Sequence, residues 1–478
     1  MGQSETPLLD ALLKWKQMNP LSFHVPGHKN GKFFSNQAIQ LYEKILAIDA
    51  TEITDLDDLH EPEGAILQAQ RLAAQWYGSK ESFFLVGGST AGNLAMILAT
   101  CKEQEIVFVQ RNSHKSIMHG LELANAKPVF LTPIVDDSTN AAACVSIETV
   151  KAAYAAYPDV KAIILTNPNY YGMTADLKPI IAFAQEHGMT VLIDEAHGAH
   201  FGIGKPFPDS AVSKGADVVV QSAHKTLPAM TMGSFLHVNE RYPHLDKLKT
   251  FLAMLQSSSP SYPIMASLDA ARHYVSQLEK KDIQAILESI GQFLQSLQAI
   301  EHIRAVHSEL PNYEQDPLKV IVQSKVGISG FELQKQLERQ AVFTELADEN
   351  NVLFVMPLAP FAAIDETVER MEKAFAENGN EPPRTGRIEP FAYESPFSTL
   401  ALSYKEMANA SKRYAALDEA IGKIAAEAVV PYPPGIPLVM KGEMLSLQHV
   451  DALKRFAENK ARFQGGSKLH ENQILIFQ

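Results

Sequence analysis

The chain has 478 residues, too many for one ordinary hydrophobic core, so we expect a large domain with one or two smaller ones. Its formal charge of −13 argues against nucleic acid or an anionic membrane as the main partner, because both require a basic face. Only two cysteines occur, no metal site is expected, and no apolar run is long enough to span a bilayer, so we expect a cytoplasmic protein.

Helical and strand patterns alternate from about residue 65 to residue 238. A helix at 65–77, closed by Gly78, precedes apolar strand segments at 82–86, 105–110, 126–131, 161–166, 189–194, 217–222 and 233–238. Such alternation is typical of parallel strands joined by right-handed helical crossovers. Because most of these segments are almost continuously apolar, we expect both faces of the sheet to be covered.

A long helical region follows at 262–300, and strand and helix patterns resume from 301 to 377 in a way that predicts a small α/β domain. We therefore predict four parts, namely an N-terminal arm and loop at 1–60, a large domain at 61–300, the small domain at 301–380 and a C-terminal segment at 381–478.

The strongest local feature is Lys225 in the segment QSAHK, directly after an apolar strand. A lysine at a buried strand end is costly if it stays charged and unpaired, so its amine is either neutralised or used. Schiff-base formation with an aldehyde cofactor achieves both. Taken alone, Lys225 fits a lysine on an exposed loop better, but the neighbouring segments favour the cofactor.

Another strand ends in the segment DEAHGAH. A carboxylate at this position can keep a pyridinium nitrogen protonated, which makes the ring a stronger electron sink. Asp194 is the first choice and Glu195 the second, with a helix-capping acid as the alternative. His197 is a candidate contact for the phenolic oxygen of the ring or for the substrate, or else a packing histidine.

The segment GGSTAGN joins a strand to a helix, and a phosphate is expected at a helix N-terminus. A simple tight turn is the alternative. Hydroxyl groups and an imidazole would complete the cradle, and the predicted contacts are Ser89, Thr90, Ala91, Ser222 and His224. His114, after another strand, can stack on an aromatic cofactor, although an isolated histidine at such a position is more often structural. All of these segments follow carboxyl ends of predicted strands, where open parallel sheets bind ligands.

Nine segments together resemble the bacterial ornithine/lysine/arginine decarboxylases, in their short form, over nearly the whole chain. They are FHVPGHKNG, LDDLHEPEG, GGSTAGN, RNSHKS, TNPNYYG, DEAHGAH, QSAHK, SSSPSYPIMASLD and PYPPGIP. The resemblance implies the aspartate-aminotransferase fold, in which a large domain with a mostly parallel sheet flanked by helices binds pyridoxal 5'-phosphate beside a smaller α/β C-terminal region.

The resemblance also implies roles for individual residues. Lys225 is the expected Schiff-base lysine, Asp194 the partner of the pyridine nitrogen and His114 the stacking residue. It further implies a homodimer or an assembly of dimers, in which Ser258 or Ser259 reaches the phosphate of the neighbouring subunit.

The expected reaction converts a basic amino acid to its amine for polyamine biosynthesis, with arginine slightly favoured over lysine and ornithine. Lys225 and His224 are candidates to reprotonate the α-carbon. Glu345 and Asp348 are candidate acceptors for the cationic side chain, unless they form a solvated turn. An aminotransferase that uses Arg384 or Arg387, another lyase on this fold, and a non-catalytic cofactor-binding protein are the alternatives.

Overall fold

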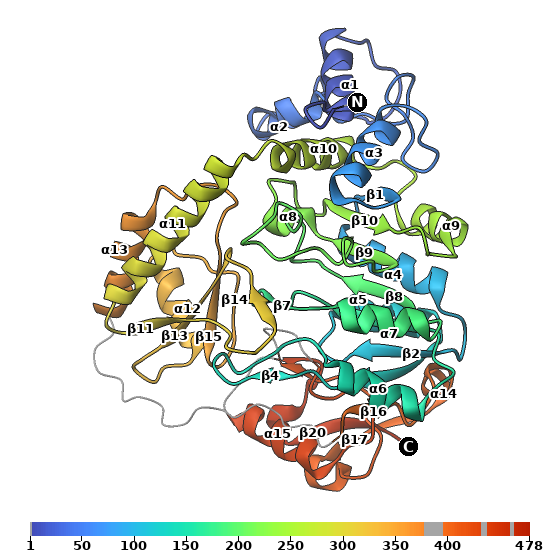
Figure 1. Cartoon of the computed structure of the whole chain (residues 1–478), viewed down its shortest axis with the longest axis vertical. Helices are drawn as coiled ribbons and strands as arrows, with labels where there is room; N and C mark the ends of the chain where they lie inside the picture. The colour runs from blue at the N-terminus through green and yellow to red at the C-terminus, as the bar shows by residue number, and fades with distance from the viewer. Residues whose placement is uncertain (1, 377–394, 432–436, 459–462) are drawn as a thin grey trace. The chain divides into compact units, whose positions relative to one another are not determined.

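The computed structural model describes residues 2–376, 395–431, 437–458 and 463–478 (Figure 1). The chain divides into two compact units, each assembled from two separate stretches of sequence. Unit 1 contains residues 1–100 and 190–280, and unit 2 contains residues 101–189 and 281–478. Within the described ranges, no helix is both long enough and apolar enough to cross a membrane.

Unit 1 contains a mixed sheet of four strands. Their order is β1 (Glu81–Leu85), β10 (Ser234–Val238), β9 (Val218–Gln221) and β8 (Thr190–Asp194). Strands β8 and β9 are parallel, whereas β10 is antiparallel to both of its neighbours. The expectation of a parallel strand at 233–238 was therefore wrong. The reason is that the connection from β9 contains only the four-residue helix α8 (Ala223–Thr226) and no crossover helix.

Six longer helices belong to unit 1: α1 (Pro7–Gln17), α2 (Ile39–Leu46), α3 (Ala65–Tyr77), α4 (Gly88–Thr100), α9 (Leu245–Leu255) and α10 (Tyr262–Ser276). Helix α3 ends at Gly78, which adopts a left-handed φ of 75°, as its glycine predicted. Helix α4 packs directly on the sheet, since a Cβ on Gly92 would lie 2.6 Å from Leu85 Cδ1 and 3.0 Å from Val220 Cγ1.

The N-terminal residues are anchored on α10, which lies beside α1 and α3 in Figure 1. Buried Asp269 accepts a hydrogen bond from the backbone N–H of Leu8 at 3.0 Å and pairs with Arg272 at 2.6 Å. The guanidinium of Arg272 donates to the carbonyl oxygens of Gln3 and Glu5 at 2.7 and 2.6 Å. The start of α1 is thus held by charge-assisted hydrogen bonds.

Unit 2 contains two sheets. The first is mixed, in the order β6 (Ala162–Thr166), β2 (Ile106–Gln110), β3 (Lys127–Leu131) and β16 (Phe397–Thr399), with only β16 antiparallel to its neighbour. The second is antiparallel, in the order β11 (Ile303–Val306), β13 (Lys319–Ser324), β15 (Asn351–Val355) and β14 (Leu346–Ala347). The helices of unit 2 before the C-terminal part are α5 (Lys115–Leu123), α6 (Ile147–Ala156), α7 (Lys178–Glu186), α11 (Lys280–Ala299), α12 (Gly330–Arg339) and α13 (Ile364–Ala376).

The expected long helical region at 262–300 consists of two helices, since α10 ends at Ser276 and α11 begins at Lys280. The expected strands and helices of the small α/β region correspond to β13, α12, β15 and α13. Its all-antiparallel sheet includes β11 and β14, which the sequence did not predict.

The C-terminal part of unit 2 packs around its own apolar cluster, which includes Leu417, Val439, Leu453 and Ile474. Its elements are α14 (Tyr404–Asn409), β17 (Lys412–Ala416), α15 (Leu447–Glu458) and β20 (Gln473–Phe477), with the short helices η1 (Leu417–Ala420) and η2 (Leu469–Glu471). Three small strand pairs complete the unit: β4 (Val135–Asp136) with β5 (Ala141–Ala142), β7 (Met173–Ala175) with β12 (Tyr313–Gln315), and β18 (Val430–Pro431) with β19 (Phe463–Gln464). The α/β class agrees with the prediction, while the four predicted domain boundaries stay a prediction.

Candidate active site

Lys225 lies in α8, directly after β9, as the sequence predicted. Its Nζ is 3.1 Å from Nε2 of His197, which follows the neighbouring strand β8 and is buried. Because one of two hydrogen-bonded nitrogens must accept, the contact requires an uncharged amine or an uncharged imidazole. The geometry therefore brings two of the predicted site residues, Lys225 and His197, together.

Asp194 is the last residue of β8, and its side chain is buried. Its Oδ2 accepts a hydrogen bond from Asn93 Nδ2 at 3.0 Å, and its Oδ1 accepts one from the backbone N–H of Ala196 at 3.1 Å. Asn93 belongs to α4, so two elements fix the orientation of this carboxylate. The sequence analysis missed Asn93, although it is the last residue of the GGSTAGN segment.

Glu195, the second choice for the pyridine partner, has different surroundings. Its carboxylate accepts hydrogen bonds from Ser210 Oγ at 2.7 Å, from the backbone N–H of Ala211 at 3.0 Å and from Gln221 Nε2 at 3.1 Å. Burial raises the pKa of Glu195 to about 7, although these hydrogen bonds act to lower it. With three protein donors already on Glu195, Asp194 remains the better candidate to face a cofactor.

The candidate phosphate site lies where α4 begins. Gly88 has a φ of +73°, and the first turn contains Ser89, which is half-buried, Thr90, which is exposed, and Ala91, which is buried. Ser222 directly follows β9. Its hydroxyl is buried and has no hydrogen-bond partner among the described residues. Buried hydroxyl groups normally have a partner, so an oxygen-rich group such as a phosphate fits this hydroxyl.

Two further histidines of the prediction have defined contacts. His224 Nδ1 is 3.1 Å from the carbonyl oxygen of Gly233, which orients its ring within unit 1. His114 belongs to unit 2, where it caps α5 by accepting a hydrogen bond from the backbone N–H of Ser116 at 3.2 Å. Its stacking role stays a prediction.

The remaining candidates are less closely organised. Ser258 and Ser259 are exposed in the segment after α9, and their contact with a phosphate stays a prediction. In unit 2, Glu345 is exposed, as a solvated turn requires. The Asp348 carboxylate instead accepts hydrogen bonds from Tyr171 and Asn351, and burial raises its pKa. Arg384 and Arg387 lie outside the described residues.

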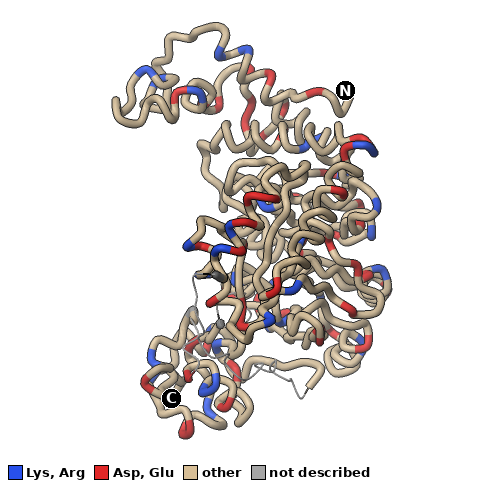
Figure 2. Tube along the Cα trace, turned by 90° about the vertical axis from the view of Figure 1, so that its left-hand side faces the viewer, with Lys and Arg blue, Asp and Glu red and all other residues tan. Residues whose placement is uncertain are grey.

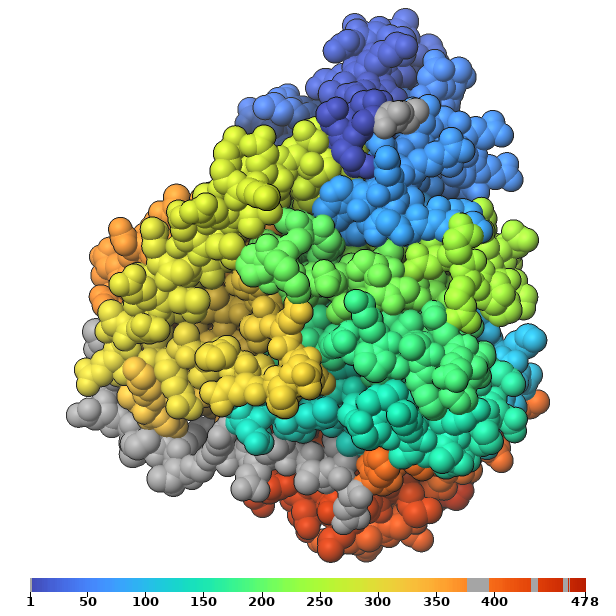
Figure 3. All heavy atoms as spheres, viewed as in Figure 1, coloured from blue at the N-terminus to red at the C-terminus, as the bar shows by residue number. Residues whose placement is uncertain are grey.

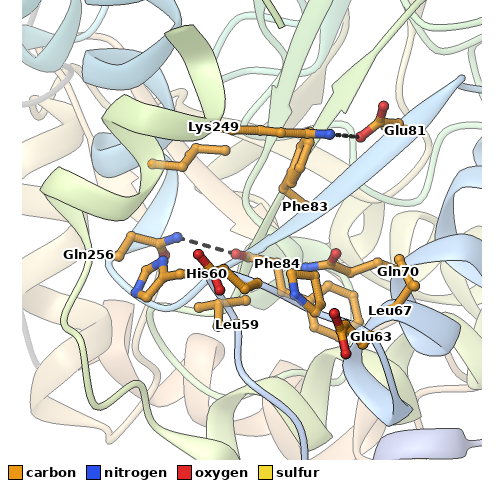
Figure 4. Close-up of a pocket in the computed structure, with 13 residues that line it drawn as sticks. Leu59, His60, Glu63, Leu67, Gln70, Glu81, Phe83, Phe84, Lys249 and Gln256 are labelled. Carbon is orange, nitrogen blue, oxygen red and sulfur yellow. Dashed lines mark hydrogen bonds and ion pairs between the residues drawn. The ribbon is translucent and has the colours of Figure 1, made fainter. Parts of the chain in front are cut away.

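A separate cavity of about 420 Å³ occurs in unit 1 (Figure 4). Figure 4 shows Lys249 paired with Glu81 at 2.9 Å on one side and Gln256 beside the backbone of Phe84 on another. Gln256 also accepts a hydrogen bond from the backbone N–H of Val86 at 2.8 Å, one residue before GGSTAGN. None of the predicted cofactor contacts lines this cavity, so it is distinct from the candidate active site.

No cluster of three or more His, Cys, Asp or Glu side chains suitable for a metal occurs in the part of the chain that the structure describes. Within unit 1 the structure instead gathers an amine, a fixed carboxylate, a helix N-terminus and an unsatisfied hydroxyl. These are the groups that pyridoxal phosphate requires for covalent attachment, ring protonation and phosphate binding.

Two protein-family descriptions match most of the chain. The description "Orn/Lys/Arg decarboxylase, major domain" matches residues 6–363, and "Orn/Lys/Arg decarboxylase, C-terminal domain" matches residues 392–468. The chain belongs to the Orn/Lys/Arg decarboxylase family. It is thus a pyridoxal-phosphate-dependent carboxy-lyase, and decarboxylation of a basic amino acid is the reaction that its relatives support.

Two relatives from Bacillus subtilis (strain 168) match 99% of this chain. The uncharacterized protein YaaO is 47% identical over 98% of its own length, and an arginine decarboxylase is 33% identical over 99% of its own length. Among solved structures, lysine decarboxylase A from Pseudomonas aeruginosa has a TM-score of 0.81 and 20% identity, covering 99% of this chain and 80% of that one. This decarboxylase confirms the predicted aspartate-aminotransferase-like fold.

Proposed function

We propose that this member of the Orn/Lys/Arg decarboxylase family acts on arginine and contributes to polyamine biosynthesis, with lysine and ornithine as the other candidate substrates. The observation that carries the catalytic part is the grouping of Lys225, Asp194 and Ser222 at the ends of two adjacent parallel strands in unit 1. The preference for arginine rests on the relatives. Arginine decarboxylases reach 33% identity over 99% of this chain, compared with 24% over 92% for a lysine decarboxylase of Escherichia coli.

Pyridoxal phosphate, when bound, supplies the electron sink that accepts the electron pair released when the carboxylate leaves as carbon dioxide. We propose that the Lys225 amine holds the cofactor covalently and that His197, 3.1 Å from that amine, orients it for attachment. Asp194 holds a proton at the pyridine nitrogen, and its hydrogen bonds with Asn93 and Ala196 keep its carboxylate oriented.

Binding of the phosphate is assigned to the first turn of α4, through Ser89, Thr90 and Ala91, together with Ser222 and His224. The backbone N–H groups of that turn provide donors and a positive dipole end. After carbon dioxide has left, Lys225 Nζ or the His224 imidazole donates a proton to the α-carbon of the product.

We also propose that the enzyme works as a homodimer. Large apolar side chains are exposed along the N-terminal arm, which lies at the surface in Figure 3 (dark blue): Leu13, Met18, Leu21, Phe23, Val25, Phe33, Phe34, Leu41, Tyr42 and Ile45. A run of this size is more than scattered surface residues and is typical of a covered interface. In such a dimer, Ser258 or Ser259 would reach the phosphate of the other subunit.

A cytoplasmic location is proposed because both cysteines, Cys101 and Cys144, are buried and form no disulfide bond in the described part of the chain. Figure 2 shows acidic and basic positions interspersed along the described trace, which suits a small-molecule enzyme better than a nucleic-acid-binding protein.

The decisive experiment incubates the purified, cofactor-loaded protein with arginine, lysine and ornithine separately and quantifies carbon dioxide and the matching amine. We expect equal amounts of both products, with arginine giving the highest kcat/KM. A higher kcat/KM for lysine or ornithine would refute the arginine assignment. Amino-group transfer to a keto acid without carbon dioxide would refute the decarboxylase assignment for this chain.

A further inference from the structure

A chain of hydrogen bonds between buried side chains crosses the sheet of unit 1 and ends at Glu195. It runs from Ser82 on β1 to His237 on β10 at 2.7 Å, from His237 to Gln221 on β9 at 3.1 Å, and from Gln221 to Glu195 at 3.1 Å. All four side chains are at most 4% exposed. None of them has a role in the reaction described above.

Each hydrogen bond of this series has a defined donor and acceptor. Gln221 Nε2 faces the Glu195 carboxylate, so Gln221 Oε1 must accept from His237 Nε2. His237 Nδ1 must then accept from the Ser82 hydroxyl. Burial lowers the pKa of His237 to about 3, so the neutral ring with one donor and one acceptor is the form at neutral pH. Hydrogen bonds aligned in this way polarise and strengthen one another.

The last hydrogen bond of this series joins the two turns that carry Asp194 and Lys225, the residues on which the cofactor chemistry depends. Glu195 directly follows Asp194, and Gln221 is the last residue of β9, four positions before Lys225. The backbone N–H of Glu195 also donates to the carbonyl oxygen of Val220 at 2.9 Å. The Glu195–Gln221 contact therefore ties the turn that carries the pyridine partner to the turn that carries the attachment lysine.

We propose that Glu195 and Gln221 are positioning residues, whose hydrogen bond sets the spacing between Asp194 and the Lys225 amine. The inference rests on the proposed roles of Asp194 and Lys225. In the proposed site, residues other than Lys225 hold the phosphate and the ring nitrogen of the cofactor. A change in the distance between Asp194 and the Lys225 amine therefore alters the strain in the covalent bond between Lys225 and the cofactor. The strain should appear in the pH at which the visible absorbance of the attached cofactor changes.

The test compares three variants of the cofactor-loaded protein. Gln221→Leu removes the contact, Glu195→Gln keeps an oxygen that can accept from Gln221, and Asn239→Ala is a matched control. Asn239 is likewise part of unit 1 and donates to the carbonyl oxygens of Val212 and Ala216 at 3.0 and 2.7 Å, away from Lys225 in the sequence. The readouts are the midpoint of the visible pH titration, the visible circular dichroism and the melting temperature.

We expect Gln221→Leu to move the titration midpoint by at least about 0.5 pH unit. Such a shift reports a change in the stability of the protonated form of the attached cofactor relative to the deprotonated form, and it is readily measured. Glu195→Gln should move it less, and Asn239→Ala should lower the melting temperature without moving it. A Gln221→Leu protein that melts earlier but keeps the wild-type midpoint and dichroism would overturn the inference. If Gln221→Leu does not fold, Gln221→Met, which matches glutamine more closely in shape and also removes the hydrogen bond to Glu195, gives the same two outcomes.

Failure of the proposed attachment is distinguishable from failure of this inference. A visible band that survives in Lys225→Ala would refute the covalent attachment to this lysine. If the band is lost in Lys225→Ala, while Gln221→Leu leaves the titration midpoint unchanged, only the positioning role of Glu195 and Gln221 is refuted.

Discussion

Arg111 and Glu443, which are 332 positions apart in the sequence, form a buried ion pair in which both guanidinium-to-carboxylate distances are 2.7 Å. Arg111 directly follows β2 and precedes the segment with His114, whereas Glu443 belongs to the C-terminal part of unit 2. The guanidinium also donates to the Ser398 hydroxyl at 2.9 Å and to the Leu438 carbonyl oxygen at 3.0 Å. The pair thus joins the C-terminal segment to the first sheet of unit 2.

The first prediction concerns this pair. Glu443→Gln should destabilise the folded protein by about 3–5 kcal/mol, because it leaves the buried Arg111 charge without a carboxylate. The free energy of unfolding in denaturant measures the effect. The double variant Arg111→Met with Glu443→Met should recover part of the loss, since no uncompensated charge remains. A single variant as stable as the wild type would contradict the prediction.

The second prediction is a pH dependence of stability that comes from Glu195. Its pKa is raised by burial from 4.5 to about 7, so between these values the folded state binds more protons than the unfolded state. This group therefore stabilises the fold fully below about pH 4.5 and loses its contribution as the pH rises through about 7, by up to roughly 3 kcal/mol.

Glu195→Gln removes the titrating group and should flatten that decline. Unfolding free energies of wild type and variant, measured from pH 4.5 to pH 8, provide the comparison. An identical slope in the two proteins would show that Glu195 does not titrate in this range.

The third prediction is that Lys225→Ala loses the visible absorbance of the bound cofactor. Without the amine no covalent attachment can form, and borohydride should no longer fix cofactor on the protein. Lys249→Ala is the matched control, because Lys249 pairs with Glu81 in the same unit and should leave the spectrum intact. Cofactor that is still reducible onto Lys225→Ala would rule out this lysine.

The fourth prediction concerns Asp194. Asp194→Ala should retain part of the cofactor affinity but lower kcat by at least about 100-fold, since the proton at the pyridine nitrogen would no longer be held. Asn93→Ala should have a smaller effect, because it removes only one of the two hydrogen bonds that orient the carboxylate. Near-normal kcat in Asp194→Ala would exclude the assigned role.

The fifth prediction concerns the N-terminal anchor. Arg272→Ala removes the donors to the carbonyl oxygens of Gln3 and Glu5 and leaves buried Asp269 without its cation. We expect proteolysis before α1 to become faster by about tenfold or more, as expected when local opening becomes easier by about 1.4 kcal/mol. Arg71→Ala, a change at an exposed residue, serves as the control. Equal cleavage rates in both variants would refute the role of Arg272 in holding the N-terminal residues.

Local sequence patterns predicted what depends on local physics. Apolar runs identified β2, β6, β8 and β9, and the residues at the end of β8 and just after β9 included Asp194 and Lys225. The direction of β10 was missed because strand pairing is decided by connections and neighbours rather than by apolar content. Asn93, 101 positions from its partner Asp194, was missed for the same reason, because a hydrogen bond between distant segments leaves no local signal.

The discontinuity of unit 1 has a consequence for the newly synthesised chain. Asp269 and Arg272 hold residues 3–9, and β10 lies between β1 and β9, so the first hundred residues lack their permanent partners until about residue 276 has left the ribosome. Until then, Leu8 and Leu12, which are fully buried in the finished fold, stay without the helix that covers them. Cofactor capture must therefore come after more than half of translation, and the nascent N-terminal segment is a natural client for a chaperone.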